Sequence, residues 1–264
     1  MVLMMIVALS ADIIAPYSPL EVHPGDRLTA PVTVSKSGAV YPLGSDDLGR
    51  DILSRTIYGA RTALTIGFLA LLFGTTTGTL LGVFSAYFGG KFDLIAQRYV
   101  DAQQSFPLLI FALAIVSALG ASKFTLIAAI SIVLVPGLSR VVRATALSVM
   151  EQQYIDAARA VGAGHMRIIF RHVLPNVVHV VIILASIQLG TTIIVEASLS
   201  YLGLGTPPPE PSWGGMLAGS GRRYLEIAPW LALVPGTAIS LAVLGINLFG
   251  DALRDVLDPR LRGT

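Results

Sequence analysis

Histidine is the side chain in this sequence best suited to metal binding or proton transfer, and only four are present: His23, His165, His172 and His179. His165 and His172 are seven residues apart, so they could share one face of a helix. Two imidazoles without nearby carboxylates make a poor metal site. The chain has no cysteine, which excludes a disulfide framework, a thiolate metal site and a cysteine nucleophile. We therefore expect no metal site and no catalytic residue.

Motifs for phosphate binding and hydrolysis are also missing from the sequence. The Gly90-Lys91 pair is followed by Phe92 and lacks the upstream glycine of a P-loop. Neither a metalloprotease H-E-x-x-H motif nor a hydrolase G-x-S-x-G motif occurs. We expect no cofactor on this chain: it should neither bind ATP through a Walker motif nor act as an enzyme.

The composition indicates a membrane protein. Of 264 residues, 54% are hydrophobic and only 13% are charged, whereas soluble domains carry about 25% charged residues. The mean hydropathy is +0.74. This charge content is too low to cover a soluble globule, which argues against a soluble enzyme. The net charge of +2 is also too small for a basic nucleic-acid-binding face.

Long uncharged runs place the expected helices. A helix needs about 20 apolar residues to cross the hydrocarbon core. We expect spans at about 63–88, 94–120, 124–148, 177–198 and 228–250, preceded by a short or truncated first helix at 1–14. A signal peptide is the alternative for residues 1–11, but it would lack a positive n-region. The fold class expected from these runs is all-α integral membrane.

Two features of the expected spans bear on function. Their apolar centres contain no clearly deep ionisable residue, which argues against a proton- or ion-coupled carrier. One helix carries a stripe of small residues, which should let another helix approach closely. The stripe consists of Gly74, Gly78, Gly82, Ala86 and Gly90.

A long polar segment, 140–176, separates the fourth and fifth spans. Apolar residues recur at helical spacing from Ile155 to Val161, and Gly162 and Gly164 then break the helix. A basic, amphipathic stretch follows at 166–173, and 174–176 should turn the chain into the next span. Such an elbow could enter a groove on a partner protein or lie on anionic headgroups. The pattern alone leaves both interpretations open.

The elbow resembles the EAA loop of ABC importer permeases. That pattern has an acidic residue, two alanines, a glycine after three further residues, and a later Leu-Pro. The corresponding residues here are Asp156-Ala157-Ala158, Gly162 and Leu174-Pro175. The sequence departs from the pattern at Asp156, where glutamate is usual, and at His172, where isoleucine is usual.

Three further segments, 43–61, 196–217 and 229–262, are similar to the C-type permease subunit of dipeptide, oligopeptide and nickel ABC importers. The resemblance runs from about Leu43 to Arg262. It implies one permease domain over 1–264 with the six-helix type I importer fold and a cytoplasmic coupling loop at 151–176. It also implies a multi-pass protein of the bacterial or archaeal cytoplasmic membrane.

The resemblance implies a set of partners. A second homologous permease subunit would complete the pathway, two ABC ATPase subunits would bind ATP and Mg, and an extracytoplasmic protein would deliver cargo. The last implied partner is the lipid bilayer, and no nucleic-acid partner is expected. Peptide is the expected cargo, with nickel or another small solute as the alternative. Two alternatives come from other classes of protein. A non-transporting scaffold subunit is compatible with the sequence, whereas an intramembrane enzyme would need a buried nucleophile, and none is visible.

The candidate site residues fall into two groups. By the resemblance, the coupling contact to the ATPase comprises Tyr154, Asp156, Ala157, Ala158, Arg159, Gly162, Ala163, Leu174 and Pro175. The candidates for an outer gate or a binding-protein contact are Asp47, Gly49, Arg50, Asp51, Leu204, Pro208 and Trp213. For the second group, helix capping near 45–51 and packing of the proline-rich 202–213 loop are equally simple explanations. Trp213 and Trp230 would suit an interfacial aromatic belt.

Overall fold

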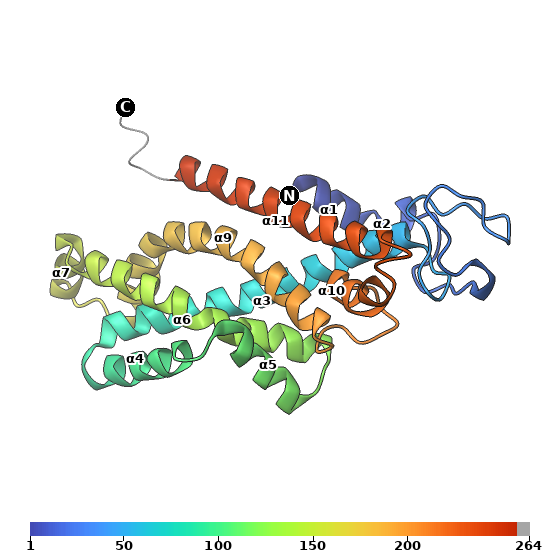
Figure 1. The fold of residues 1–264 in the computed structure, drawn as a ribbon. Helices are drawn as coiled ribbons and strands as arrows, with labels where there is room; N and C mark the ends of the chain where they lie inside the picture. Colours follow the sequence, from blue (N-terminus) through green and yellow to red (C-terminus); the bar gives the residue numbers. More distant parts are fainter. Residues whose placement is uncertain (258–264) are drawn as a thin grey trace.

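The computed structural model describes residues 1–257, and its regular elements are helices (Figure 1). Within these residues there is no strand, only isolated bridges. The helices are α1 (Val2–Leu9), α2 (Ala11–Ile14), α3 (Ile52–Phe88), α4 (Gly90–Gln104), α5 (Leu108–Leu119), α6 (Lys123–Met150), α7 (Gln153–Ala160), α8 (His165–Ile168), α9 (Leu174–Tyr201), α10 (Trp213–Met216) and α11 (Trp230–Leu257). The last part of the family-like C-terminal segment, 258–262, lies outside the described residues.

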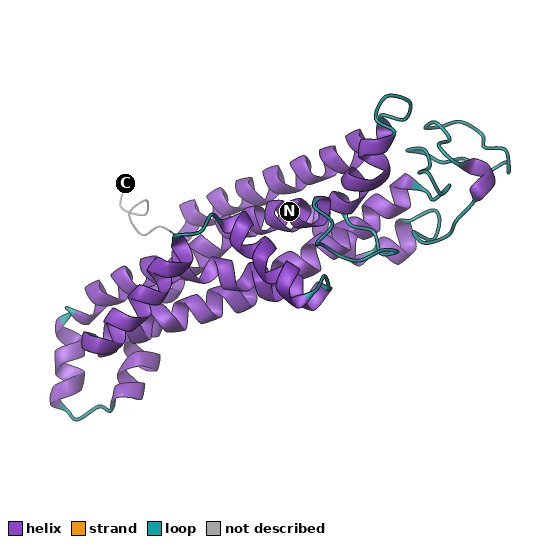
Figure 2. Cartoon of the chain, turned by 60° about the horizontal axis from the view of Figure 1, so that its bottom comes forward, coloured by secondary structure: helices purple, strands orange, loops and turns teal. Residues whose placement is uncertain are grey.

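The long helices form an elongated bundle. Figure 1 and Figure 2 show α7 at one end and the loops of residues 15–51 at the other, next to the start of α3. In the described part of the chain, four helical segments are long and apolar enough to cross a membrane: 52–88, 123–150, 165–201 and 230–256. The first segment, α1 and α2, is shorter than a span requires.

The region expected as one span at 94–120 is not one continuous helix. This region is two helices, α4 and α5, bent by 92° at residues 105–107. Pro107 is the N-cap residue of α5, and a proline disfavours helical backbone at the residue before it. The pair can count as a fifth span only as a broken one.

The small-residue stripe is a seam between α3 and α6. A Cβ atom added at Gly74 or Gly82 would lie 2.9 Å from the carbonyl oxygen of Ser131 or 2.6 Å from that of Ser139. The two backbones therefore touch where the sequence predicted close packing. The prediction is wrong for Gly90, which lies beyond the end of α3 and has no atom within 4 Å of its Cβ position.

We expect Gly82→Ala to lower the thermal midpoint of the purified protein. The new methyl group would meet backbone atoms of Ser139 and Arg143, which cannot rotate away, at a cost of about 1–3 kcal/mol. Gly236→Ala in α11 is the control, because its Cβ meets nothing within 4 Å and alanine is the better helix former by about 1 kcal/mol. Equal thermal midpoints for the two variants would contradict the close packing of α3 against α6 at Gly82.

Polar contacts fix α4 against α3 and α6. The Arg143 guanidinium donates to the Asp93 carboxylate, with Nε 2.6 Å from Oδ1, and Ser85 hydrogen-bonds to the same carboxylate. Arg140 of α6 reaches Asp101 of α4 at 2.7 Å. These charge-assisted bonds brace the end of the bundle that carries α7.

Candidate functional site

The candidate site is the elbow formed by α7, the turn after it and α8. Ile155 of α7 is completely buried and joins an apolar cluster with residues of α3, α6 and α9, among them Val83, Val142 and Val177. The other α7 residues are half-buried or exposed. A single apolar anchor therefore seats α7 on the bundle and leaves most of its surface available.

Gly162 ends the elbow helix with a Schellman cap. Its φ is +78°, in the left-handed region that favours glycine. The Gly162 N–H donates to the Arg159 carbonyl and the Ala163 N–H donates to the Ala158 carbonyl, both at 3.0 Å. This 5→2 and 6→1 pair satisfies two of the last helix carbonyls. The sequence-based expectation that Gly162 breaks the helix is confirmed.

A surface groove of about 520 Å³ runs beside the capped helix. Its lining consists of Tyr154, Ala157, Ala158, Val161, Ala163, Arg167, Arg171 and His172. Val161 is 84% exposed at the tip. Arg167 and Arg171 lie one turn apart and form no ion pair within the described residues. The groove thus has an apolar floor of small residues and a basic edge, which suits a protein surface with acidic groups.

The structure brings only part of the predicted coupling set together. Tyr154, Ala157, Ala158 and Ala163 line the groove. Asp156 and Arg159 form an exposed ion pair, with Nη1 3.3 Å from Oδ1, outside the groove lining. Sequence reasoning missed Val161, Arg167 and Arg171, although the basic amphipathic pattern at 166–173 was a usable signal.

Leu174 and Pro175 do not turn the chain, contrary to expectation. A π-helical turn at 169–173 joins α8 to α9, so the chain is helical from His165 to Tyr201. Pro175 therefore lies inside a continuous helix, directly after the π-helical turn, and removes one backbone hydrogen bond there. Leu174 packs on the apolar cluster below α7. The non-helical part of the predicted 151–176 loop is therefore limited to the turns beside α7.

His165 and His172, which could have shared one helix face, make separate contacts. The Nδ1 atom of His165 is 2.9 Å from the Tyr87 hydroxyl, whereas His172 packs near the ring of Tyr154. Within the described residues, no group of three or more histidine, aspartate or glutamate side chains could hold a metal ion.

At the opposite end of the bundle, Asp51 is the N-cap of α3. Its carboxylate accepts from the Ser54 N–H and from the Ser54 hydroxyl, each at 2.7 Å, which confirms the capping interpretation for this residue. Burial raises the pKa of Asp51, and these hydrogen bonds only partly oppose that shift. Gly49 has φ +80°, and a Cβ there would lie 1.9 Å from the His23 carbonyl oxygen, so only glycine fits.

The key residue of this turn is Asp46, which the sequence-based selection of Asp47 and Arg50 missed. Its Oδ1 accepts from the backbone N–H groups of Leu48 (2.8 Å) and Arg50 (2.9 Å). Its Oδ2 accepts from Arg50 Nε at 2.6 Å and lies 3.7 Å from Nε of the buried Arg55. Asp47 is only half-buried beside it. An aspartate three residues before a glycine is typical of a tight turn and was an available signal.

A second buried carboxylate orders the preceding loop. Asp26 accepts from the N–H and hydroxyl of Ser37 and from the Tyr41 hydroxyl. The Ser37 hydroxyl, above all, holds the pKa of Asp26 below its usual value, and burial together with Asp26 raises the pKa of Tyr41. Because the folded-state pKa of Asp26 is lowered, its stabilising effect should be lost as the pH falls through that pKa.

The proline-rich loop after α9 packs on the bundle. Trp213 is 3% exposed, and its Nε1 donates to the Thr56 carbonyl at 2.9 Å. The expectation that Trp213 belongs to an interfacial aromatic belt is therefore wrong, because its ring is buried against Gly59 of α3. Leu204 is half-buried against the core and Pro208 is exposed.

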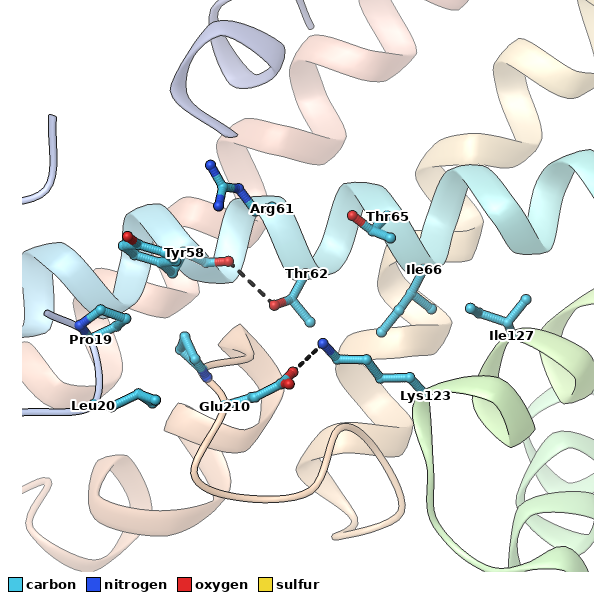
Figure 3. Close-up of a pocket in the computed structure, with 11 residues that line it drawn as sticks. Pro19, Leu20, Tyr58, Arg61, Thr62, Thr65, Ile66, Lys123, Ile127 and Glu210 are labelled. Carbon is cyan, nitrogen blue, oxygen red and sulfur yellow. Dashed lines mark hydrogen bonds and ion pairs between the residues drawn. The ribbon is translucent and has the colours of Figure 1, made fainter. Parts of the chain in front are cut away.

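A pocket of about 290 Å³ lies between this loop, α3 and α6 (Figure 3). Its charged lining residues are Arg61, Lys123 and Glu210. Lys123 forms an ion pair with Glu210, which ties the loop to the start of α6. Arg61 bonds to Asp12 at 2.8 Å. These cations are already paired, so the pocket offers no free charge to an anionic ligand.

The fold is a membrane-type helical bundle that displays a capped, grooved elbow. The chain belongs to the family of binding-protein-dependent transport system inner membrane components, whose profile matches residues 78–263. It is therefore a permease component of an ABC importer and a multi-pass membrane protein.

Curated relatives support the family assignment over nearly the whole chain. The dipeptide transport system permease protein DppC of Alkalihalophilus pseudofirmus is 41% identical over 97% of this chain and 82% of that protein. The di/tripeptide permease protein DppC of Pseudomonas aeruginosa is 40% identical over 99% and 86%. The glutathione permease protein GsiD of Escherichia coli is 40% identical over 99% and 84%.

Solved structures show the same fold. The inward-facing MetNI methionine ABC transporter aligns with a TM-score of 0.63 and 21% identity, covering 78% of this chain and 98% of that one. An amino acid ABC transporter crystallised with histidines aligns with a TM-score of 0.58 and 17% identity, covering 79% and 95%. The expected type I ABC importer permease fold is confirmed.

Proposed function

We propose that this chain forms half of the translocation pathway of a peptide importer and couples it to ATP hydrolysis by partner subunits. The other half is a second, homologous permease. The transporter lies in the cytoplasmic membrane of a bacterium or archaeon, with α7 on the cytoplasmic side. ATP and Mg bind to two ABC ATPase subunits and not to this chain.

The observation that carries this proposal is the groove beside α7. Its floor is built from Ala157, Ala158 and Ala163, so a partner can approach the helix backbone closely. Ile155 anchors the elbow in the apolar cluster of the bundle, and the Schellman cap at Gly162 fixes the turn that follows α7. A rigid, grooved protrusion can transmit movement of an ATPase to the spans, whereas a mobile loop could not.

The outer end suits contact with an extracytoplasmic substrate-binding protein. The 15–51 loops and the 202–212 loop lie at this end (Figure 1). They are held by the buried contacts of Asp26, Asp46 and Trp213. A preorganised surface loses less conformational entropy when it binds a partner. Among the predicted outer residues, Pro208 is exposed and Asp47, Arg50 and Leu204 are half-buried, whereas Gly49, Asp51 and Trp213 are buried.

Short peptides are the proposed cargo because relatives at about 40% identity are named as dipeptide and di/tripeptide permeases. A relative of similar identity is named as a glutathione permease, and glutathione is itself a tripeptide. Nickel or another small solute is the alternative cargo, and a non-transporting scaffold is the alternative role.

Co-purification with a C-terminal tag in mild detergent tests the proposal. We expect a second permease and two Walker-motif ATPases in near-equal amounts, identified by mass spectrometry. The ligand bound to the associated binding protein then identifies the cargo. Recovery of a stable, monodisperse chain without an ATPase in any detergent would instead favour the scaffold.

A further inference from the structure

A cavity of about 200 Å³ lies where α4 breaks into α5, beside the middle of α6. Its polar side chains are three neutral amides: Gln103 and Gln104 from the end of α4, and Gln188 from α9. Pro136 and Gly137 form the α6 wall, and they lie halfway along that 28-residue helix. The cavity therefore lies about midway along the bundle, away from both the elbow and the outer loops, on the side of α4 and α5, where Gln104, Phe106 and Gly137 of its lining are exposed.

Two features indicate that this cavity meets water or cargo and not lipid. Non-helical backbone inside a membrane is tolerated only where it is buried in protein or lines an aqueous cavity, and the break of the candidate span at 105–107 is exposed on this chain, with Phe106 lining the cavity. In addition, Gln103 is only 7% exposed, and its Oε1 atom has no hydrogen-bond partner within the described residues. A buried amide oxygen without a partner is unfavourable, so this acceptor is available to cargo or to water in the cavity.

The cavity wall has the chemistry of a neutral hydrogen-bonding site. No acidic, basic or histidine side chain is among the described residues that line it. Each glutamine amide offers both a donor and an acceptor. Pro136 cannot donate to the carbonyl four residues before it, which leaves that backbone acceptor without its usual partner. Stacked rings of Phe106 and Phe111, 5.8 Å apart, provide an apolar side.

We propose that this cavity is a transport subsite that binds the backbone amide of a peptide in transit, with Gln103 as its central contact. This inference rests on the proposed peptide cargo. A peptide bond that leaves water must find a donor and an acceptor, and the glutamine amides supply both. The absence of a charged partner in the described wall keeps binding weak, so that cargo can also leave.

Gln103→Met tests the contact with nearly unchanged side-chain volume. The assembled transporter, with its binding protein, is placed in liposomes that enclose the ATPase side with ATP. Uptake of labelled alanyl-alanine is compared with uptake of alanyl-sarcosine, which lacks the peptide N–H. We expect the ratio of the two rates to fall about fivefold in the variant, the effect of one lost hydrogen bond. Because the binding protein is the same throughout, the change reports on the permease.

Gln97→Met is the matched control. Gln97 lies on the same helix but donates to Ser85, outside the cavity, so the ratio should stay at the wild-type value. A ratio that Gln103→Met does not change overturns the subsite. If the wild-type transporter takes up neither peptide, the proposed peptide cargo fails as well, and this outcome is distinct from the first.

Gly137→Leu tests the same cavity without altering an amide. A Cβ at Gly137 meets nothing within 4 Å, so the variant should fold, while the longer side chain fills the space. We expect uptake of both peptides to fall several-fold. Gly236→Leu in α11 is the control. Gly236 also follows a proline, Pro235, and a Cβ there likewise meets nothing within 4 Å, so this variant should keep wild-type uptake. Wild-type uptake by Gly137→Leu would overturn the proposal.

Discussion

Replacing Ala158 by leucine should lower peptide uptake and transport-coupled ATP hydrolysis about tenfold, while the amount of protein in the membrane stays normal. Ala158 is half-buried in the floor of the elbow groove. A leucine there would occupy the space into which the proposed ATPase partner fits. A loss of about 1.4 kcal/mol at an interface corresponds to a factor of ten, and central interface positions often cost more.

The control for this variant is Ala160→Leu. Ala160 is on the same helix and exposed, but it does not line the groove, so the same substitution adds the same volume on another face. We expect it to transport at nearly the wild-type rate. If Ala158→Leu also transports normally, the groove is not the coupling surface. If both variants fail equally, a general disturbance of α7 is the cause and not the groove.

Gly162→Val should produce the same functional loss by a different route. The left-handed backbone at Gly162 costs about 1–2 kcal/mol for a residue with a side chain, although no neighbouring atom would obstruct a Cβ. The Schellman bonds to the Arg159 and Ala158 carbonyls would weaken. Uptake should fall, whereas the global thermal midpoint should change little, because α7 is anchored mainly by Ile155.

The elbow could be predicted because its signals are local. Apolar positions at helical spacing and a glycine after the last helical turn determine where α7 ends, and both can be read from neighbouring residues. The close seam at Gly74, Gly78 and Gly82 was equally accessible, since a spacing of four places small residues on one helix face. The groove itself was only partly predictable, because Arg167 and Arg171 come to lie beside α7 only when the chain is folded.

The bend between α4 and α5 could not be derived from uncharged runs. Hydropathy averages over a segment and does not report the direction of the chain, so the polar α4 and the apolar α5, bent by 92°, together pass the same length and composition test as one straight span. Pro107 was a signal for the break. The burial of Trp213 depends on Gly59 and Thr56, more than 150 residues earlier, so its sequence neighbourhood could not reveal it.

Asp46→Ala should lower the free energy of unfolding by about 3–5 kcal/mol, the cost of removing one partner from a buried ion pair. The Asp46 side chain is 2% exposed and that of Arg55 is 8% exposed. Without the carboxylate, Arg55 would keep a buried charge, and among the described residues only the Pro19 carbonyl, 2.9 Å from Nη1, would accept from it. The Leu48 and Arg50 N–H groups would also lose their acceptor. Thermal unfolding of the detergent-purified protein measures the loss.

Asp47→Ala and Asp46→Ala/Arg55→Met separate the cause of this loss. Asp47 is adjacent but half-buried, so its replacement should change the midpoint little. If the uncompensated charge of Arg55 is the main cost, removing that charge as well should restore part of the stability, because an ion pair replaced by apolar groups is often neutral. A double variant less stable than Asp46→Ala would show instead that the turn hydrogen bonds, and not the charge, hold the start of α3.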